Sequence, residues 1–250
     1  NCSSGYASAS VKNQHEFVMN VLIVHAHPEP QSFTSALKDA AVAELTAAGH
    51  EVVVSDLYAM NFNPVASAAD FGSRGSEDYL NYALEQRHNV KANSLASDIA
   101  AELAKIQAAD LVLLSFPLYW FSMPAILKGW IDRVFVSGIV YGGRRIYDQG
   151  GLSGKRAMVI ATTGGRDHMV SASGIHGDLT ETLKPVLQGT LGYAGMTVLA
   201  PFYGYHVPYI SQEAREAVLD DFRTQLRDIA KRETLVMPSL ASFDAEMKPL

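Results

Sequence analysis

The feature that most constrains the fold is a regular alternation of short apolar runs with amphipathic segments, which begins near residue 20. The run at 111–116 is apolar except for Ser115, as expected for a central parallel strand covered on both faces. Similar runs predict strands at 21–25, 51–55, 157–162 and 197–202. Helical spacing predicts helices at 33–48, 125–135, 177–190 and 212–233. Strands alternating with helices predict a parallel α/β sheet of five strands in a doubly wound three-layer sandwich.

Two segments fall outside that alternation. Residues 59–93 predict a long excursion between the second and third strands, with some helix around 78–88, and excursions of this length are usually functional. Residues 1–18 are polar and aperiodic, and we expect a disordered or tag-like extension there. Residues 19–250 are expected to form a single domain.

Composition excludes several classes of protein. The 250 residues are 48% hydrophobic and 18% charged, which is too apolar for a disordered chain, and the net charge is −6 with no basic block longer than two residues. These values argue against a nucleic-acid partner and against insertion in a membrane. Cys2 is the single cysteine, so a disulfide scaffold is excluded and a cytoplasmic location is expected.

Several common motifs are missing. No G-x-G-x-x-G follows the first strand, no G-x-S-x-G elbow is present, and the pair Gly154-Lys155 lacks the remainder of a phosphate-binding loop. His25 and His27 have the spacing of two ligands on one strand, but no third ligand stands out nearby. We therefore expect no metal site.

The loops that follow the strands carry the residues suited to a flat, anionic cofactor. After the first strand, His27 is followed by Ser32, Phe33 and Thr34 at a helix start, where free N–H groups and hydroxyls suit a pyrophosphate. A capped helix after a proline-rich turn explains the same residues equally well.

After the third strand come Pro117, Leu118, Tyr119, Trp120 and Phe121, an aromatic series that fits either a ring system or core packing.

Two further loops complete the series. Thr162, Thr163, Gly164 and Gly165 follow the fourth strand, and paired glycines allow a ligand to approach the backbone closely, although a plain turn is the alternative. His176 lies between glycines ahead of a helix. A lone histidine is more often structural, but this position makes it a candidate proton donor or acceptor.

In their order along the chain, these motifs resemble the FAD-dependent NAD(P)H:quinone oxidoreductases of the DT-diaphorase type, a family of flavodoxin-like homodimers. The resemblance covers about residues 21–232. It is carried by LIVHAH with Ser32-Phe33, by SDLYAMNFNP, by AADLVLLSFPLYWFSMPAILKGWIDRVF, by TTGG and by GIHGD.

The resemblance implies specific site residues. The family's cofactor contacts fall on His27, Phe33, Thr34, Pro117, Leu118, Tyr119, Trp120, Phe121, Thr162, Thr163, Gly164, Gly165 and Arg215. Its quinone pocket, shared across the dimer interface, falls on Trp120, Phe121, Tyr141, Met169, His176 and Tyr193. His176 is the implied catalytic residue.

The chain departs from the family pattern at three places. Gly143 replaces a second pocket tyrosine, Tyr119 replaces a glutamine of the aromatic loop, and Val170 replaces the tyrosine that the family pairs with its histidine. The spacing from Val170 to His176 is kept, so the last departure is a substitution rather than a shift of register.

The resemblance implies two-electron reduction of quinones by NAD(P)H in a ping-pong scheme through FAD, which makes the cofactor the chemical agent. The alternatives are an azo- or nitroreductase with the same flavin, or a flavoprotein that carries electrons or senses redox state. An FMN protein also fits the residues themselves. The preference between NADH and NADPH and the identity of the quinone stay open.

Overall fold

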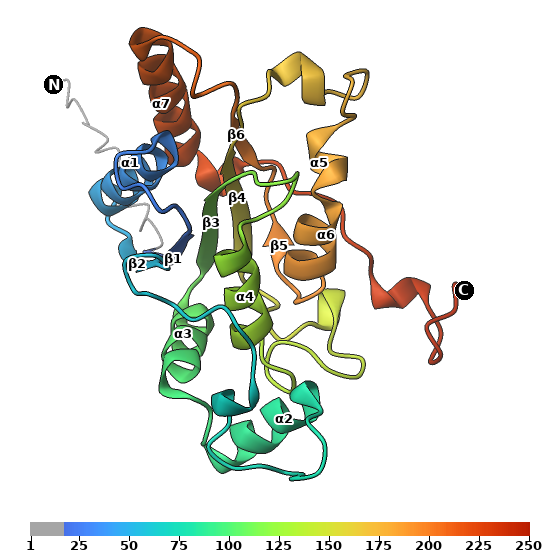
Figure 1. The fold of residues 1–250 in the computed structure, drawn as a ribbon. Coiled ribbons are helices and arrows are strands. Elements are labelled where there is room, and N and C mark those ends of the chain that lie inside the picture. The colour runs from blue at the N-terminus through green and yellow to red at the C-terminus, as the bar shows by residue number, and fades with distance from the viewer. Residues whose placement is uncertain (1–17) are drawn as a thin grey trace, which may run out of the picture.

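The computed structural model describes residues 18–250, and its centre is a twisted parallel sheet (Figure 1). The strands are β1 (Asn20–His25), β2 (Glu51–Asp56), β3 (Leu111–Pro117), β4 (Arg156–Thr162), β5 (Thr197–Val198) and β6 (Phe202–Gly204). Their order is β2-β1-β3-β4-β5, with β6 also paired to β4, and every pairing is parallel. All seven residues of β3 are buried, as the apolar run at 111–116 predicts for a central strand.

The fifth strand was predicted as one continuous run at 197–202, and this prediction is wrong. The strand is divided into β5 and β6, which pair with opposite ends of β4. Between them the N–H of Ala200 donates to Glu233, and Leu199 forms an antiparallel bridge with Thr234. Pro201 has no N–H to offer a neighbouring strand, so the ladder is interrupted there.

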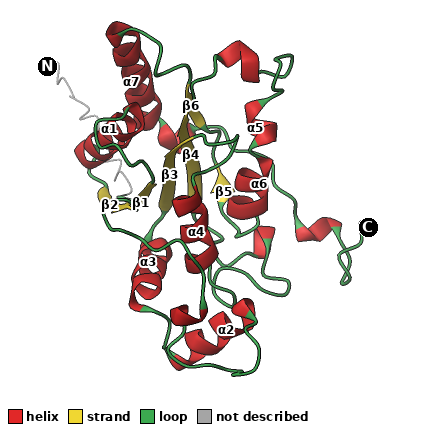
Figure 2. Ribbon diagram, in the orientation of Figure 1, coloured by secondary structure: helices red, strands yellow, loops and turns green. Residues whose placement is uncertain are grey.

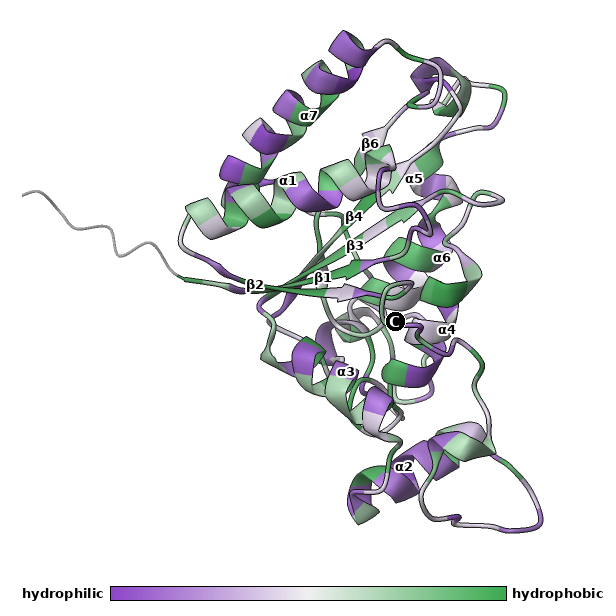
Figure 3. Ribbon diagram, turned by 60° about the vertical axis from the view of Figure 1, so that its left-hand side comes forward, coloured by the Kyte–Doolittle hydropathy of each residue, from purple (hydrophilic) through white to green (hydrophobic). Residues whose placement is uncertain are grey.

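Helices cover both faces of the sheet, which gives the predicted three-layer sandwich (Figures 1 and 2). Helices α1 (Phe33–Ala47) and α7 (Gln212–Arg227) close one core, with buried residues such as Leu37 and Phe222. Helices α3 (Ser97–Ala108), α4 (Ala125–Val134), α5 (Leu179–Thr182) and α6 (Lys184–Val186) close the other. In Figure 3 the strands are predominantly hydrophobic, whereas α7 is largely hydrophilic.

The boundaries of the helices confirm some predictions and correct others. Helix α1 ends one residue before its predicted boundary, and Gly49 follows its C-cap with a φ of +85°. The region predicted as one helix at 177–190 is instead α5, α6 and a π-helical stretch at Leu187–Gly192. Pro185 lies in this region and cannot donate a helical hydrogen bond.

Two more helices differ from their prediction. Helix α7 ends at Arg227 and is followed by a 3₁₀ turn at Ile229–Lys231, so the predicted helix at 212–233 is too long. Helix α3 was not predicted at all. Its buried residues Ile99, Leu103 and Ile106 do have helical spacing.

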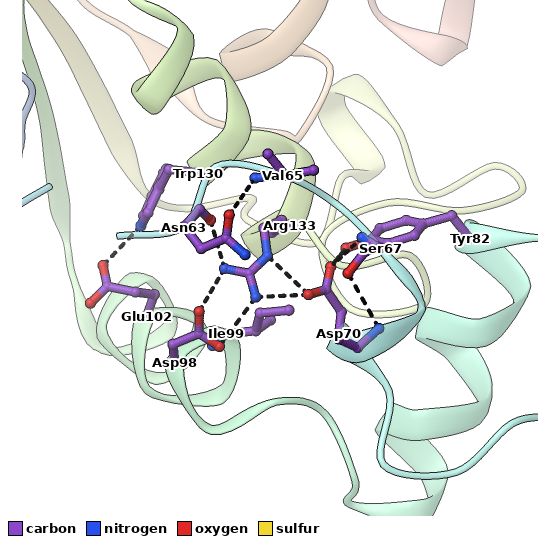
Figure 4. Close-up of polar contacts among 11 residues, drawn as sticks. Asn63, Val65, Ser67, Asp70, Tyr82, Asp98, Ile99, Glu102, Trp130 and Arg133 are labelled. Atoms are coloured by element: carbon purple, nitrogen blue, oxygen red, sulfur yellow. Dashed lines mark hydrogen bonds and ion pairs between the residues drawn. The ribbon is translucent and has the colours of Figure 1, made fainter. Parts of the chain in front are cut away.

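A buried ion-pair network attaches the long excursion to the sandwich (Figure 4). The excursion contains a 3₁₀ turn (Ala68–Asp70) and helix α2 (Tyr82–Ala92), which confirms a helix near 78–88. Asp70 accepts hydrogen bonds from Arg133 at 2.8 and 3.2 Å and from the Tyr82 hydroxyl at 2.5 Å. Arg133 also contacts Asp98 at 2.6 Å. The network thus joins the excursion to α3 and α4.

Across residues 18–250, no helix combines the length and the apolar composition that are needed to cross a bilayer. The expected extension at residues 1–18 lies almost wholly outside the part of the chain that the structure describes.

Candidate functional site

A cleft of about 640 Å³ opens at the carboxyl ends of the strands. Ten residues predicted to contact the cofactor line it: His27, Phe33, Thr34, Pro117, Leu118, Tyr119, Thr162, Thr163, Gly164 and Arg215. These residues come from five separate stretches of the chain. Trp120, Phe121 and Gly165 belong to the same loops but do not line the cleft. The size falls within the range typical of ligand sites.

The first turn of α1 presents unsatisfied donors to this cleft. Ser32 caps the helix by accepting a hydrogen bond from the N–H of Ser35 at 3.1 Å. The N–H groups of Phe33 and Thr34 have no acceptor among residues 18–250. Unpaired N–H groups at the positive end of a helix dipole favour an anionic ligand group.

His27 adds a directional donor beside the helix start. Its Nδ1 accepts a hydrogen bond from the N–H of Glu29 at 2.9 Å, so the neutral ring carries its proton on Nε2. Burial lowers the pKa of His27, against the opposing effects of the Glu29 N–H and the Glu29 carboxylate. The ring is therefore neutral near pH 7, and its Nε2–H can donate to a ligand in the cleft.

Thr34 and Thr162, which were predicted to contact the cofactor, are both buried and bond to each other. Their hydroxyl oxygens lie 2.7 Å apart. The N–H of Leu118 donates to the Thr162 carbonyl at 2.8 Å, which connects the β3 and β4 loops. The hydroxyl pair and the Leu118–Thr162 backbone hydrogen bond together hold the β3 and β4 loops in place beside the cleft.

The aromatic loop after β3 has an unusual backbone conformation. Tyr119 and Ser122 exchange hydrogen bonds across a tight turn at 3.0 Å, with Trp120 and Phe121 at its centre. Both central residues have positive φ, 51° and 57°, which is uncommon for aromatic side chains. Trp120 is 98% exposed. Strained, exposed aromatic residues of this kind occur preferentially at ligand sites.

The glycine loop after β4 is held by the segment that follows β6. His206 donates its backbone N–H to Gly165 at 2.9 Å, and its Nδ1 lies 2.8 Å from the Gly164 carbonyl oxygen. Arg215 reaches the same segment, since its Nε donates to the Val207 carbonyl at 3.0 Å. Arg215 thus lines the cleft from α7, with its guanidinium oriented by backbone carbonyls.

His176 lies next to the aromatic loop. Its ring centroid is 5.2 Å from that of Phe121, and its N–H donates to the Met169 carbonyl at 2.9 Å. His176 itself is exposed. Three residues predicted for the quinone pocket, Phe121, Met169 and His176, are therefore neighbours in one chain.

Tyr141 and Tyr193 form a second group. Their rings lie 6.2 Å apart, and neither lines the cleft. They belong to segments that lead into the amino ends of β4 and β5, whereas His176 follows the carboxyl end of β4. Gly143, near Tyr141, has a φ of +60° and open space where a side chain would lie.

Val170 and His25 do not face a ligand. Val170 is buried in the larger hydrophobic core, so this position supplies packing rather than a polar group. His25 is 1% exposed, and its two ring nitrogens contact the hydroxyls of Ser115 and Ser35, each at 3.1 Å. Burial lowers the pKa of His25 to about 4. Residues 18–250 contain no group of three His, Cys, Asp or Glu side chains placed to share a metal.

The sequence reasoning missed part of the cleft wall. Besides the predicted residues and Ser32, the wall contains Gln31, Ala36, Val207, Pro208, Gln212 and Leu219. The first two lie beside predicted residues at the start of α1. Val207 and Pro208 follow β6, and Gln212 and Leu219 belong to α7. Because the last strand ends at the same edge of the sheet as the other strands, the residues after it could have been predicted to line the cleft.

Comparisons with known proteins agree with this geometry. The family model described as a flavodoxin-like fold matches residues 19–229. The chain is 45% identical over 216 residues to a ribosyldihydronicotinamide dehydrogenase [quinone] from Pongo abelii, covering 86% of this chain and 94% of that protein. It is 42% identical over 228 residues to NAD(P)H dehydrogenase [quinone] 1 from Rattus norvegicus, covering 91% of this chain and 83% of that protein.

A solved structure is similar over nearly the whole chain. It is a Klebsiella pneumoniae protein assigned as a quinone reductase, with a TM-score of 0.83 and 36% identity. The match covers 92% of this chain and 90% of that one.

Proposed function

Because the chain belongs to the NAD(P)H:quinone oxidoreductase family of the flavodoxin-like fold, we propose that it reduces quinones with a reduced nicotinamide through a bound FAD. The observation that carries this proposal is the cleft at the carboxyl ends of the strands, where ten residues with the family's cofactor positions converge.

The residues of the cleft fit a flavin nucleotide. The free N–H groups of Phe33 and Thr34 and the Nε2–H of His27 suit a pyrophosphate. Leu118, Tyr119 and the Thr163–Gly164 backbone offer a flat, largely apolar wall for the ring system. Arg215, on the far wall, suits the adenosine half. The preference for FAD over FMN rests on the family resemblance.

Bound FAD would accept a hydride from the nicotinamide and deliver it to the quinone. The chain's own residues then have three tasks. The β3 and β4 loops orient the rings, Trp120 and Phe121 exclude water from the exposed ring face, and His176 donates a hydrogen bond to the oxygen on which negative charge develops. Because residue 170 is a valine, His176 acts without a neighbouring phenol from that position.

We further propose a homodimer that completes the quinone pocket. Large apolar side chains near the cleft are exposed in a single chain, among them Trp120, Ile175 and Tyr209. Several large apolar side chains exposed near one site are typical of a surface that contacts another protein chain. In the proposed dimer, Tyr141 and Tyr193 of the partner would face Phe121 and His176. Sedimentation velocity at micromolar concentration should give twice the chain mass, and a fully active monomer would contradict this arrangement.

The cofactor is tested by releasing it from purified protein and measuring its mass. FAD is expected, whereas FMN, or no flavin after reconstitution with FAD, would refute this part of the proposal. Activity is tested by NAD(P)H oxidation, which should depend on added quinone. A flavin semiquinone with poor turnover would instead indicate an electron carrier.

The role of His176 is tested by His176→Ala in stopped-flow measurements of both half-reactions. Loss of one donor aimed at developing charge should slow hydride transfer by about 100-fold, equivalent to about 2.7 kcal/mol. His168→Ala is a matched control, since His168 lies on the same loop, is exposed and contacts Asp167 instead. Rates within twofold of the parent for His176→Ala would show that the assignment is wrong.

The reductant has three candidates: NADH, NADPH and dihydronicotinamide riboside. Relatives 44–45% identical are named ribosyldihydronicotinamide dehydrogenases, and the chain covers 94% of their length, compared with 83% for the NAD(P)H dehydrogenase from rat. This similarity favours testing dihydronicotinamide riboside beside NADH and NADPH. Comparison of kcat/KM for flavin reduction by the three compounds decides between them.

A further inference from the structure

A second cavity, of about 320 Å³, lies away from the proposed flavin cleft, between helix α2 and the loop before β4. It is lined by Arg87, Gly138, Tyr141, Gly142, Gly143 and Arg145. None of these residues lines the larger cleft. Two guanidinium groups from segments 58 residues apart therefore face the same small space.

The position of Arg87 is fixed by the loop beneath it. Its Nε donates to the Ser137 hydroxyl at 2.9 Å, and Ser137 is fully buried. The preceding residue, Gln86, accepts a hydrogen bond from the Ser137 N–H at 2.9 Å. Side chains at Gly138 or Gly142 would approach the Arg87 side chain to 3.2 and 3.1 Å, so these glycines leave the room that its stem and guanidinium occupy.

Arg145 is held from the opposite side. Its Nη1 donates to the carbonyl oxygens of Gly138 at 2.9 Å and Ile139 at 3.3 Å. Its backbone closes a tight turn with Gly142 through reciprocal hydrogen bonds of 3.0 and 3.3 Å. All the hydrogen-bond acceptors of both arginines are neutral.

The charge of these two groups is unbalanced. Of the nine other arginines, Arg74, Arg133, Arg223 and Arg227 each pair with a carboxylate, and the remaining five do not within the described part of the chain. Among residues 18–250, no carboxylate lies within ion-pair distance of Arg87 or Arg145. What distinguishes Arg87 and Arg145 is that both line one cavity and that no carboxylate of the described residues lines it with them.

We propose that this cavity, defined here as the Arg87–Arg145 pocket, binds a phosphate monoester. Two guanidinium forks match the −2 charge and the three terminal oxygens of a phosphate monoester better than the single charge of a carboxylate. Tyr141, which the proposed dimer would place beside the quinone pocket of the other subunit, also lines this space. The cavity also leaves room for the organic part of the ligand.

Calorimetric titration of the purified holoenzyme with inorganic phosphate and with adenosine 2′-monophosphate provides the direct test. Binding should weaken by about tenfold or more in Arg87→Gln and in Arg145→Gln, and it should weaken with rising salt. Arg145→Gln alters an exposed loop residue, so it remains informative if Arg87→Gln disturbs α2. Arg144→Gln is the matched control, because Arg144 is the adjacent exposed arginine and reaches the carbonyls of Asp244 and Ala245 instead.

Absence of phosphate binding, equal binding by benzoate, or equal weakening in Arg144→Gln would overturn the proposal. A kinetic arm distinguishes the source of the phosphate and rests on the proposed function. If Arg145→Gln raises KM for NADPH but not for NADH, the ligand group is the 2′-phosphate of NADPH. If the KM values for NADPH and NADH are both unchanged while phosphate binding is lost, the pocket binds a separate phosphorylated compound. The calorimetric arm does not depend on the proposed function, because phosphate should bind to the pocket even if the protein has no quinone reductase activity.

Discussion

Removal of the Arg133 guanidinium tests how the long excursion is attached to the sandwich. Asp70 is 1% exposed and Arg133 is 3% exposed. The substitution Arg133→Met keeps an unbranched apolar stem but leaves the Asp70 carboxylate buried without its cation. Breaking a buried pair in this way typically costs about 3–5 kcal/mol of unfolding free energy. This is a large part of the roughly 5–15 kcal/mol that stabilises a domain.

Two further variants separate the charge from other effects. The Asp98 side chain is 41% exposed, so Asp98→Asn should cost less than about 1 kcal/mol although it contacts the same guanidinium. Asp70→Asn added to Arg133→Met removes the buried charge while it keeps an acceptor for Tyr82. The double variant should therefore be more stable than Arg133→Met alone. Urea denaturation followed by circular dichroism, at one protein concentration, measures all four proteins.

The pH dependence gives a second readout. Burial raises the pKa of Asp70, but hydrogen bonds from Arg133, Tyr82 and the Ser67 N–H outweigh burial and lower it. In the parent, this stabilisation is present above the unfolded pKa of about 3.9 and is lost as the pH falls further. In Arg133→Met, burial should raise the pKa of Asp70, so protonation relieves the destabilisation as the pH falls toward 4. A loss below 1 kcal/mol at pH 7, or an equal loss at pH 7 and pH 5, would refute this reasoning.

Three other predictions concern the sheet and the cleft. The lowered pKa of His25, about 4, means that the unfolded chain takes up its proton first as the pH falls below 6.5. Stability should therefore drop by about 2 kcal/mol between neutral pH and pH 5, with a smaller drop in His25→Gln as measured by urea denaturation. Thr162→Val leaves the Thr34 hydroxyl buried without a partner, so it should lower the unfolding free energy by about 1–3 kcal/mol in urea denaturation. The double variant Thr34→Val, Thr162→Val removes both hydroxyls and should recover part of this loss. Gly129→Ala would bring a methyl group to 2.1 Å from the Pro64 carbonyl oxygen, and the resulting overpacking should cost about 1–3 kcal/mol, seen as a lower melting temperature.

The sequence by itself determined the layers of the fold and most of the cleft wall. A strand such as β3 that is buried on both faces is apolar at nearly every position, so this pattern is visible without coordinates. The loops at 27–34, 117–121 and 162–165 were also predictable as parts of one site. Each follows a predicted strand, and the carboxyl ends of parallel strands meet at one edge of the sheet. Helix α3 was missed although Ile99, Leu103 and Ile106 have the required spacing.

Tertiary structure decided the contacts between segments that are far apart in the chain. The Thr34–Thr162 hydroxyl pair, the Arg133–Asp70 ion pair and the two arginines of the Arg87–Arg145 pocket each bring together residues separated by 58 positions or more. Such pairs leave no periodic signal, since their partners are set by how the excursion and the loops pack. The interruption of the fifth strand likewise depends on residues 233–235, which pair with 198–200 only in the folded chain. Local pattern therefore specified the elements, and long-range packing specified which of their side chains meet.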